Sequence, residues 1–90
     1  PKLSRYKAWS LNNIGCVYYD LKEYDKALKC HQKALKIKER FYKESKNISQ
    51  EIYNSDIAIA WSQIGSDLRQ LKRFEEALSS CNKALEIRKK

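Results

Sequence analysis

The sequence predicts an all-α fold built from two helix-turn-helix units. The 90 residues include only two glycines and one proline, too few for a turn-rich β-sandwich. Apolar residues recur three and four positions apart, which is the spacing of amphipathic helices. The chain also resembles itself when it is shifted by 50 residues, and such self-similarity indicates a duplicated structural unit.

The internal repeat pairs residues 8–38 with residues 58–88. Identical pairs fall at one fixed offset, and conservative pairs such as Tyr24 with Phe74 lie between them. The identical pairs are Ala8 with Ala58, Ile14-Gly15 with Ile64-Gly65, Leu21-Lys22 with Leu71-Lys72, Ala27-Leu28 with Ala77-Leu78, Lys33-Ala34-Leu35 with Lys83-Ala84-Leu85, and Ile37 with Ile87.

Each unit is expected to form two antiparallel helices, because the polar link between the apolar stretches is only a few residues long. We expect helices near 6–20 and 24–44 in repeat one, which covers about 6–44, and near 56–70 and 74–88 in repeat two, which covers about 56–88. Residues 1–90 then form a single domain fragment.

Residues 45–55 form the predicted connector between the repeats. They are polar and include Lys46, Asn47, Ser49, Asn54 and Ser55. No glycine or proline occurs from Cys16 to Ile64, so a helix that continues through the connector remains an alternative.

Small residues are expected where the two helices of a unit touch. Gly15 and Gly65 lie in the middle of predicted helices, where a glycine costs about 1 kcal/mol relative to alanine. Close approach by the partner helix would offset this cost. Alanines suit the same contact, because a larger side chain would push the helices apart; they are Ala27, Ala34, Ala77 and Ala84.

These residues resemble the tetratricopeptide repeat, an α-α superhelix, over roughly 80 residues. Repeat two has Trp61, Ile64-Gly65 and Leu68 at the spacing of that pattern, followed by Phe74, Ala77 and Lys83-Ala84-Leu85; repeat one has Leu11, Ile14-Gly15 and Tyr18, followed by Tyr24, Ala27 and Lys33-Ala34-Leu35. The endings at 34–40 and 84–89 are similar to the longer repeats of kinesin light chains.

The sequence departs from the family pattern at three places. His31 and Cys81 replace the usual aromatic residue of the second helix, and Glu39 and Lys89 stand where a proline usually follows. The offset of 50 also exceeds the common period of 34 residues.

The resemblance implies a noncatalytic protein-interaction module in a longer array, whose groove holds a peptide or a partner helix. By helical phase, the first helix of each repeat lines this groove. Amide groups can bind a peptide backbone, and Trp9 and Tyr19 offer flat contact area, although both aromatics equally fit a face covered by a neighbouring repeat. The candidate residues are Trp9, Asn12, Asn13, Cys16, Tyr19, Asp20, Ile59, Ser62, Gln63, Ser66, Arg69 and Gln70.

Related repeats that clamp a carboxylate use a lysine and an asparagine. The matching positions here hold Asn12 and Cys16 in repeat one and Ser62 and Ser66 in repeat two. The lysine is missing, so binding of a chaperone's carboxylate tail is disfavoured.

A basic face is the alternative functional feature. The chain has a net charge of +8, and residues 1–46 hold twelve basic and five acidic side chains, against seven and six in residues 47–90. Spacings of four and three place seven basic residues on one helix face: Lys22, Lys26, Lys29, Lys33, Lys36, Arg40 and Lys43. Such a face is by default solvated; otherwise it docks acidic proteins, anionic membrane surfaces or nucleic acid. No aromatic residue interleaves the lysines, which disfavours nucleic acid.

An enzyme is not expected. His31 is the single histidine and falls on the apolar face of its helix, so the packed-imidazole interpretation is preferred to a catalytic or ligand role. Cys16, Cys30 and Cys81 form neither a metal motif nor a disulfide framework, and we expect no metal and no cofactor. No secretion signal or membrane-length apolar segment is seen, so the expected location is cytoplasmic.

Two repeats are fewer than the three that such stacks normally need. We therefore expect the fragment to self-associate, either by stacking or by exchange of units through a helical connector.

Overall fold

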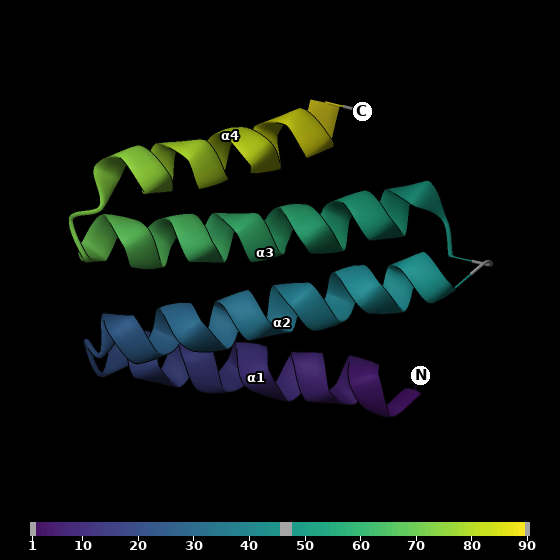
Figure 1. Cartoon of the computed structure of the whole chain (residues 1–90), viewed down its shortest axis with the longest axis horizontal. Helices are drawn as coiled ribbons and strands as arrows, with labels where there is room; N and C mark the ends of the chain where they lie inside the picture. The colour runs from purple at the N-terminus through teal and green to yellow at the C-terminus, as the bar shows by residue number, and fades with distance from the viewer. Residues whose placement is uncertain (1, 46–47, 90) are drawn as a thin grey trace.

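A computed structural model describes residues 2–45 and 48–89, and side chains from Tyr6 onward within those ranges. It contains four helices: α1 (Lys2–Asp20), α2 (Tyr24–Glu44), α3 (Gln50–Gln70) and α4 (Phe74–Lys89). Helix α1 packs against α2, α3 packs against α4, and α2 joins the two pairs by packing against α3 (Figure 1). The result is a flat stack with extents of 38, 29 and 15 Å.

The predicted all-α architecture of two helix pairs is confirmed. No strand occurs in residues 2–45 or 48–89, and no helix in those ranges is long and apolar enough to span a bilayer. The predicted bounds are matched for α2 and nearly matched for α4, whereas α1 begins four residues earlier than expected.

The connector is shorter than predicted, because α3 begins at Gln50 and not near residue 56. Ser49 caps the new first turn: its hydroxyl accepts a hydrogen bond from the backbone N–H of Ile52 at 3.2 Å. Asp56 and Tyr53, from the start of α3, contact Tyr42 of α2, so packing supports the added turns. Helix α2 ends at Glu44, and the extended backbone of Ser45, the capping residue that follows, interrupts the helix. Lys46 and Asn47 lie outside the described residues.

The turn inside each repeat has the same geometry. Lys22 and Lys72 both adopt a left-handed backbone with φ of 63°. The N–H of Lys22 donates to the carbonyl of Tyr19 at 3.0 Å, and the N–H of Glu23 donates to the carbonyl of Tyr18 at 2.8 Å. These two bonds make a Schellman cap, which ends α1 and lets α2 turn back.

Both glycines lie buried at the helix contact, as predicted. A Cβ atom on Gly15 would lie 2.7 Å from His31 Nε2 and 3.2 Å from the Cβ of Cys30. On Gly65 it would lie 2.8 Å from Cys81 Sγ and 3.5 Å from the carbonyl oxygen of Ala77. The second helix of each pair therefore occupies the space that a side chain would need.

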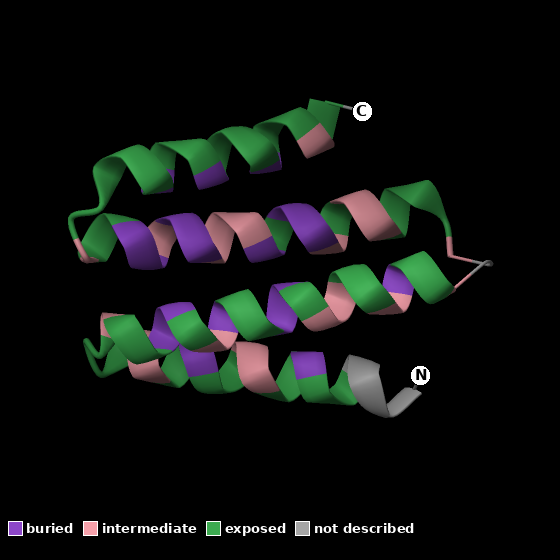
Figure 2. Cartoon of the chain, viewed as in Figure 1, coloured by how far each residue is buried: buried purple, intermediate pink, exposed green. Residues whose placement is uncertain are grey.

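The main core lies between α2, α3 and α4, where buried residues follow the facing sides of the helices (Figure 2). Helix α3 is covered on both sides, whereas α1 is covered on one. Repeat-equivalent residues show the consequence: Ile64 is 3% exposed and Ile14 is 47% exposed. The core cluster consists of Leu28, Leu35, Tyr42, Ile57, Ala60, Ile64, Leu68 and Ala77.

Candidate functional site

The first helices of the two repeats, α1 and α3, are bridged by side chains along a line that we call the α1–α3 seam. Two weak side-chain contacts cross it. The Gln70 amide donates to the Tyr19 hydroxyl at 3.2 Å, and the Gln63 amide nitrogen lies 3.9 Å from Cys16 Sγ. The seam is therefore polar and bridged by flexible side chains, whereas the contact between α2 and α3 also buries apolar residues such as Leu35 and Ile64.

Five of the twelve predicted groove residues come together at the seam. They line one cavity of about 250 Å³, which we call the seam pocket. Two residues outside the prediction, His31 of α2 and Asp67 of α3, complete its wall. The five predicted members are Cys16, Tyr19, Asp20, Gln63 and Ser66.

Trp9 and Asn12 line a separate cavity of about 140 Å³ near the beginnings of α1 and α3. Its remaining wall is formed by Lys38, Phe41 and Tyr42 of α2 and by Asp56 of α3. Lys38 Nζ lies 2.9 Å from Asp56 Oδ1, and the Tyr42 hydroxyl donates to Asp56 Oδ2 at 2.6 Å. This cavity and the seam pocket thus follow one another along the first helices.

The other predicted groove residues line neither of these two cavities. Asn13 and Arg69 are exposed, Ser62 is half-buried, and Gln70 reaches across the seam to Tyr19. Ile59 lines a different cavity of about 440 Å³, beside Ile87 and Arg88 of α4.

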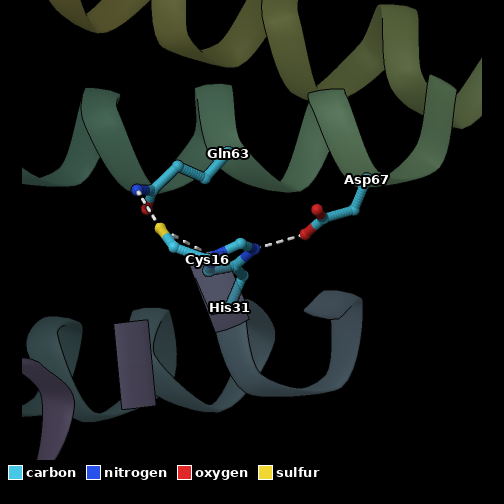
Figure 3. Close-up of polar contacts among 4 residues, drawn as sticks. All are labelled: Cys16, His31, Gln63 and Asp67. Carbon is cyan, nitrogen blue, oxygen red and sulfur yellow. Dashed lines mark hydrogen bonds and ion pairs between the residues drawn. The ribbon is translucent and has the colours of Figure 1, made fainter. Parts of the chain in front are cut away.

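A chain of polar groups runs beneath the seam pocket (Figure 3). His31 Nδ1 pairs with Asp67 Oδ2, and His31 Nε2 lies 4.0 Å from Cys16 Sγ. His31 is 3% exposed and Asp67 is fully buried. His31 is thus packed inside the protein, where it pairs with a carboxylate from the other repeat.

Sequence reasoning missed Asp67. Its position corresponds to Val17 in repeat one, and it stands among Ile64, Leu68 and Leu71 on the apolar side of its helix. An acidic residue at an apolar position was the available signal, since a buried carboxylate needs a partner. The two partners lie 36 residues apart, so no local spacing could pair them.

The order of thiol, imidazole and carboxylate resembles that of nucleophilic sites, but the electrostatics oppose activation. Burial raises the pKa of the Cys16 thiol, and the charges of Asp20 and Asp67 raise it further. A reactive cysteine needs a lowered pKa, because the thiolate is the nucleophile. Cys16 is held as a neutral thiol, suited to donate a hydrogen bond. No cluster of three or more metal-binding side chains occurs among the described residues.

The seven predicted basic-face residues are all exposed. Six lie on α2, while Lys22 lies in the turn before it and so is not part of the helix. Lys26 pairs with Glu23 at 3.1 Å and Arg40 pairs with Glu44 at 3.5 Å. These exposed pairs are worth little in stability, and the face stays strongly positive.

A wider cavity of about 510 Å³, which sequence reasoning did not anticipate, lies between α2, α3 and α4. Its apolar wall includes Leu35, Ile64 and Trp61, and Lys83 Nζ lies 4.3 Å from the centre of the Trp61 ring. Basic and acidic side chains both line it, so its charge does not favour one kind of ligand: Lys36, Glu39, Glu76 and Lys83.

Comparison with known proteins agrees with the duplicated architecture. A family model for the tetratricopeptide repeat matches residues 8–41 and residues 58–90. A search of curated proteins and a search of solved structures each find no match. The narrower likeness to kinesin light chains stays a prediction. With both repeats matched over most of the chain, this protein belongs to the tetratricopeptide repeat family.

Proposed function

We propose that this chain binds an extended peptide or a partner helix along the α1–α3 seam. Tetratricopeptide repeats generally mediate protein–protein interaction and generally act as noncatalytic scaffolds. The observation that carries the proposal is the succession of two cavities along the first helices, one at Trp9 and Asn12 and the other at Cys16 and Gln63. Such a series suits a ligand that runs along the helices and places side chains at intervals.

The chemistry of the cavities supports the same ligand class. Trp9 is 64% exposed, and a large rigid aromatic of this kind provides much contact area at small entropic cost. Asn12 beside it carries both a donor and an acceptor for a peptide backbone.

The proposal includes a longer array of repeats in the cytosol. Apolar residues lie exposed on or beside both outer helices: Ile14 on α1, Leu21 in the turn after it, and Leu78 and Leu85 on α4. Neighbouring repeats would cover these faces. The three cysteines are free, which is typical of a reducing compartment.

The test is selection of ligands from a random peptide library, followed by anisotropy measurements on the selected peptides. We expect Trp9→Ala to weaken binding by about tenfold or more, because interface tryptophans commonly contribute over 1 kcal/mol. Tyr6→Ala is the control, since Tyr6 is an equally exposed aromatic of α1 that lines neither seam cavity. Peptides whose affinity is unchanged by Trp9→Ala would refute binding along the seam.

The basic face offers a second candidate function, docking onto acidic proteins, anionic membranes or nucleic acid. All seven residues are exposed, which supports it. We expect affinity for vesicles containing phosphatidylserine to fall steeply as salt rises, and to fall again when Lys29, Lys33 and Lys36 become glutamine. Equal binding to neutral and anionic vesicles would contradict this candidate.

A further inference from the structure

The seam pocket has a chemical character that contrasts with the rest of the chain. Two carboxylates, Asp20 and Asp67, belong to its wall, and neither lysine nor arginine does, although the chain contains 19 such residues. The other polar groups of the wall are the His31 imidazole, which pairs with Asp67, the Cys16 thiol, the Tyr19 and Ser66 hydroxyls and the Gln63 amide. An acidic pocket therefore lies on a basic protein.

Two acceptor atoms of this wall have no hydrogen-bond partner among the described residues. They are Asp67 Oδ1 and Gln63 Oε1, and both are buried. The other carboxylate oxygen of Asp67 already pairs with His31. An unpaired buried acceptor costs free energy that a donor group could recover.

The electrostatic field of the carboxylates in the pocket also favours a group that donates hydrogen bonds and carries positive charge. The pKa of the Cys16 thiol is raised by burial and, beyond that, by the negative charges of Asp20 and Asp67. Burial opposes a charge of either sign, but the two carboxylates that add to the shift would attract a positive charge brought to the same place.

We infer that the seam pocket binds one cationic side chain, a lysine ammonium or an arginine guanidinium, of the partner peptide. This inference rests on the proposed function, because a ligand that follows the seam passes the pocket. The exposed Asp20 carboxylate meets the cation first, and the buried Asp67 carboxylate, whose Oδ2 pairs with His31, lies behind it. A volume of about 250 Å³ suits a single side chain, since drug-sized ligands occupy about 300–1,000 Å³.

The test titrates the isotope-labelled full chain with methylguanidinium and with methylammonium, followed by amide chemical shifts. Neutral N-methylacetamide and acetate are the comparison ligands. Both cations should give saturable shifts at residues 16–20 and 63–67, and the comparison ligands should not. Asp20→Asn should weaken the cation affinity by about fivefold, the size expected for one exposed charge contact.

Asp25→Asn is the matched control, because it removes an exposed carboxylate that does not line the pocket. It should leave the cation affinity unchanged. Equal affinity of Asp20→Asn and the unaltered chain, or equal shifts with N-methylacetamide, would overturn the inference. Asp67→Asn adds a second comparison if circular dichroism shows that it folds; if it does not fold, Asp20→Asn alone decides.

The selected peptides separate this inference from the proposed function. Peptides that depend on Trp9 and also lose affinity in Asp20→Asn support both. A different result is peptides that depend on Trp9, contain no lysine or arginine, and bind the Asp20→Asn variant with unchanged affinity. Such peptides overturn the cation site and leave the proposed function intact. Saturable cation binding without any Trp9-dependent peptide refutes the proposed function and leaves the pocket's chemistry intact.

Discussion

At the scale of single residues, the pKa of the Cys16 thiol reflects the groups that surround it at the seam. It lies 4.0 Å from His31 Nε2, on the side of the ring opposite the Asp67 carboxylate. A thiol with a lowered pKa would have marked a nucleophile, whereas this pKa is raised. The residue that resembles part of a catalytic set is therefore better understood as an exposed neutral thiol beside the buried His31–Asp67 pair.

Cys16 should react slowly with iodoacetamide at neutral pH. A raised pKa leaves less thiolate than in a free cysteine, so the alkylation rate should reach its plateau only at higher pH. Asp20→Asn should speed the reaction, because one of the charges that raise the pKa is removed. Alkylation rates against pH, in a chain with Cys30→Ala and Cys81→Ser, measure this. Asp25→Asn should have no effect, and a rate at neutral pH above that of free cysteine would contradict the assignment.

Loss of one partner of the His31–Asp67 pair should lower the free energy of unfolding strongly. Replacement of both partners by apolar residues should lower it little. Asp67→Val leaves a buried imidazole without its partner, and we expect a loss of about 3 kcal/mol in the free energy of unfolding. Adding His31→Leu removes the second polar group and should recover most of this loss. Denaturant unfolding of both variants checks the expectation. A double variant as unstable as the single one would show that the imidazole's shape matters more than its charge pairing.

Replacement by alanine should lower the stability of the fold more at Gly15 than at Gly65. The new Cβ of Gly15→Ala would meet the His31 ring, which Asp67 and burial hold in place, so we expect a loss of about 1–3 kcal/mol. The new Cβ of Gly65→Ala would meet the sulfur of Cys81, an exposed residue whose side chain can rotate away. There the helix propensity of alanine, worth about 1 kcal/mol, should offset the crowding. Thermal melts of the two variants test this order, and equal losses would contradict it.

At the scale of helices, the sequence predicted each element but not each boundary. The period of apolar residues defined α2 well, because its buried residues span most of its length, from Ala27 to Tyr42. The start of α3 was missed because its added turns are polar and are held by contacts with α2, in which Tyr42 meets Tyr53 and Asp56. The local pattern of apolar residues does not reveal such contacts between helices.

The turns were predicted only as short links, because their left-handed residues are lysines where glycine is usual. Lys22→Gly and Lys72→Gly should each stabilise the fold by about 0.5–1 kcal/mol, since glycine adopts a φ of 63° without the penalty that a Cβ incurs. The control is Lys29→Gly in the exposed middle of α2, which should destabilise by about 1 kcal/mol. Chemical denaturation measures all three, and destabilisation by Lys22→Gly would contradict the cap assignment.

At the scale of the whole molecule, the sequence predicted one part of the candidate site and missed the other. Helical phase selected residues of α1 and α3 that share the seam pocket, such as Cys16 and Gln63. It could not supply His31 and Asp67, which meet only because α2 of one repeat packs against α3 of the next. How the repeats stack, and not the pattern within either one, determines that part of the site.

The same stacking suggests how copies of the chain can associate. At the internal contact, Leu28 and Leu35 of α2 are buried together with Ile64 of α3. Their repeat-equivalents, Leu78 and Leu85 on α4 and Ile14 on α1, are 63%, 52% and 47% exposed. One copy's α4 can therefore pack on the α1 of another in the manner of the internal contact. At the position of the His31–Asp67 pair, such a joint would place the equivalent residues Cys81 and Val17.

We expect the sedimentation coefficient of the chain to rise with concentration in the micromolar range, because this contact joins unlike faces and repeats head to tail. Leu78→Glu should abolish the rise, since it places a charge in the centre of the joint. Ile52→Glu is the control, as Ile52 is similarly exposed but belongs to α3 and to neither of the helices that form the joint. A monomer at every concentration would exclude self-association, and association that survives Leu78→Glu would instead favour exchange of helix pairs between copies.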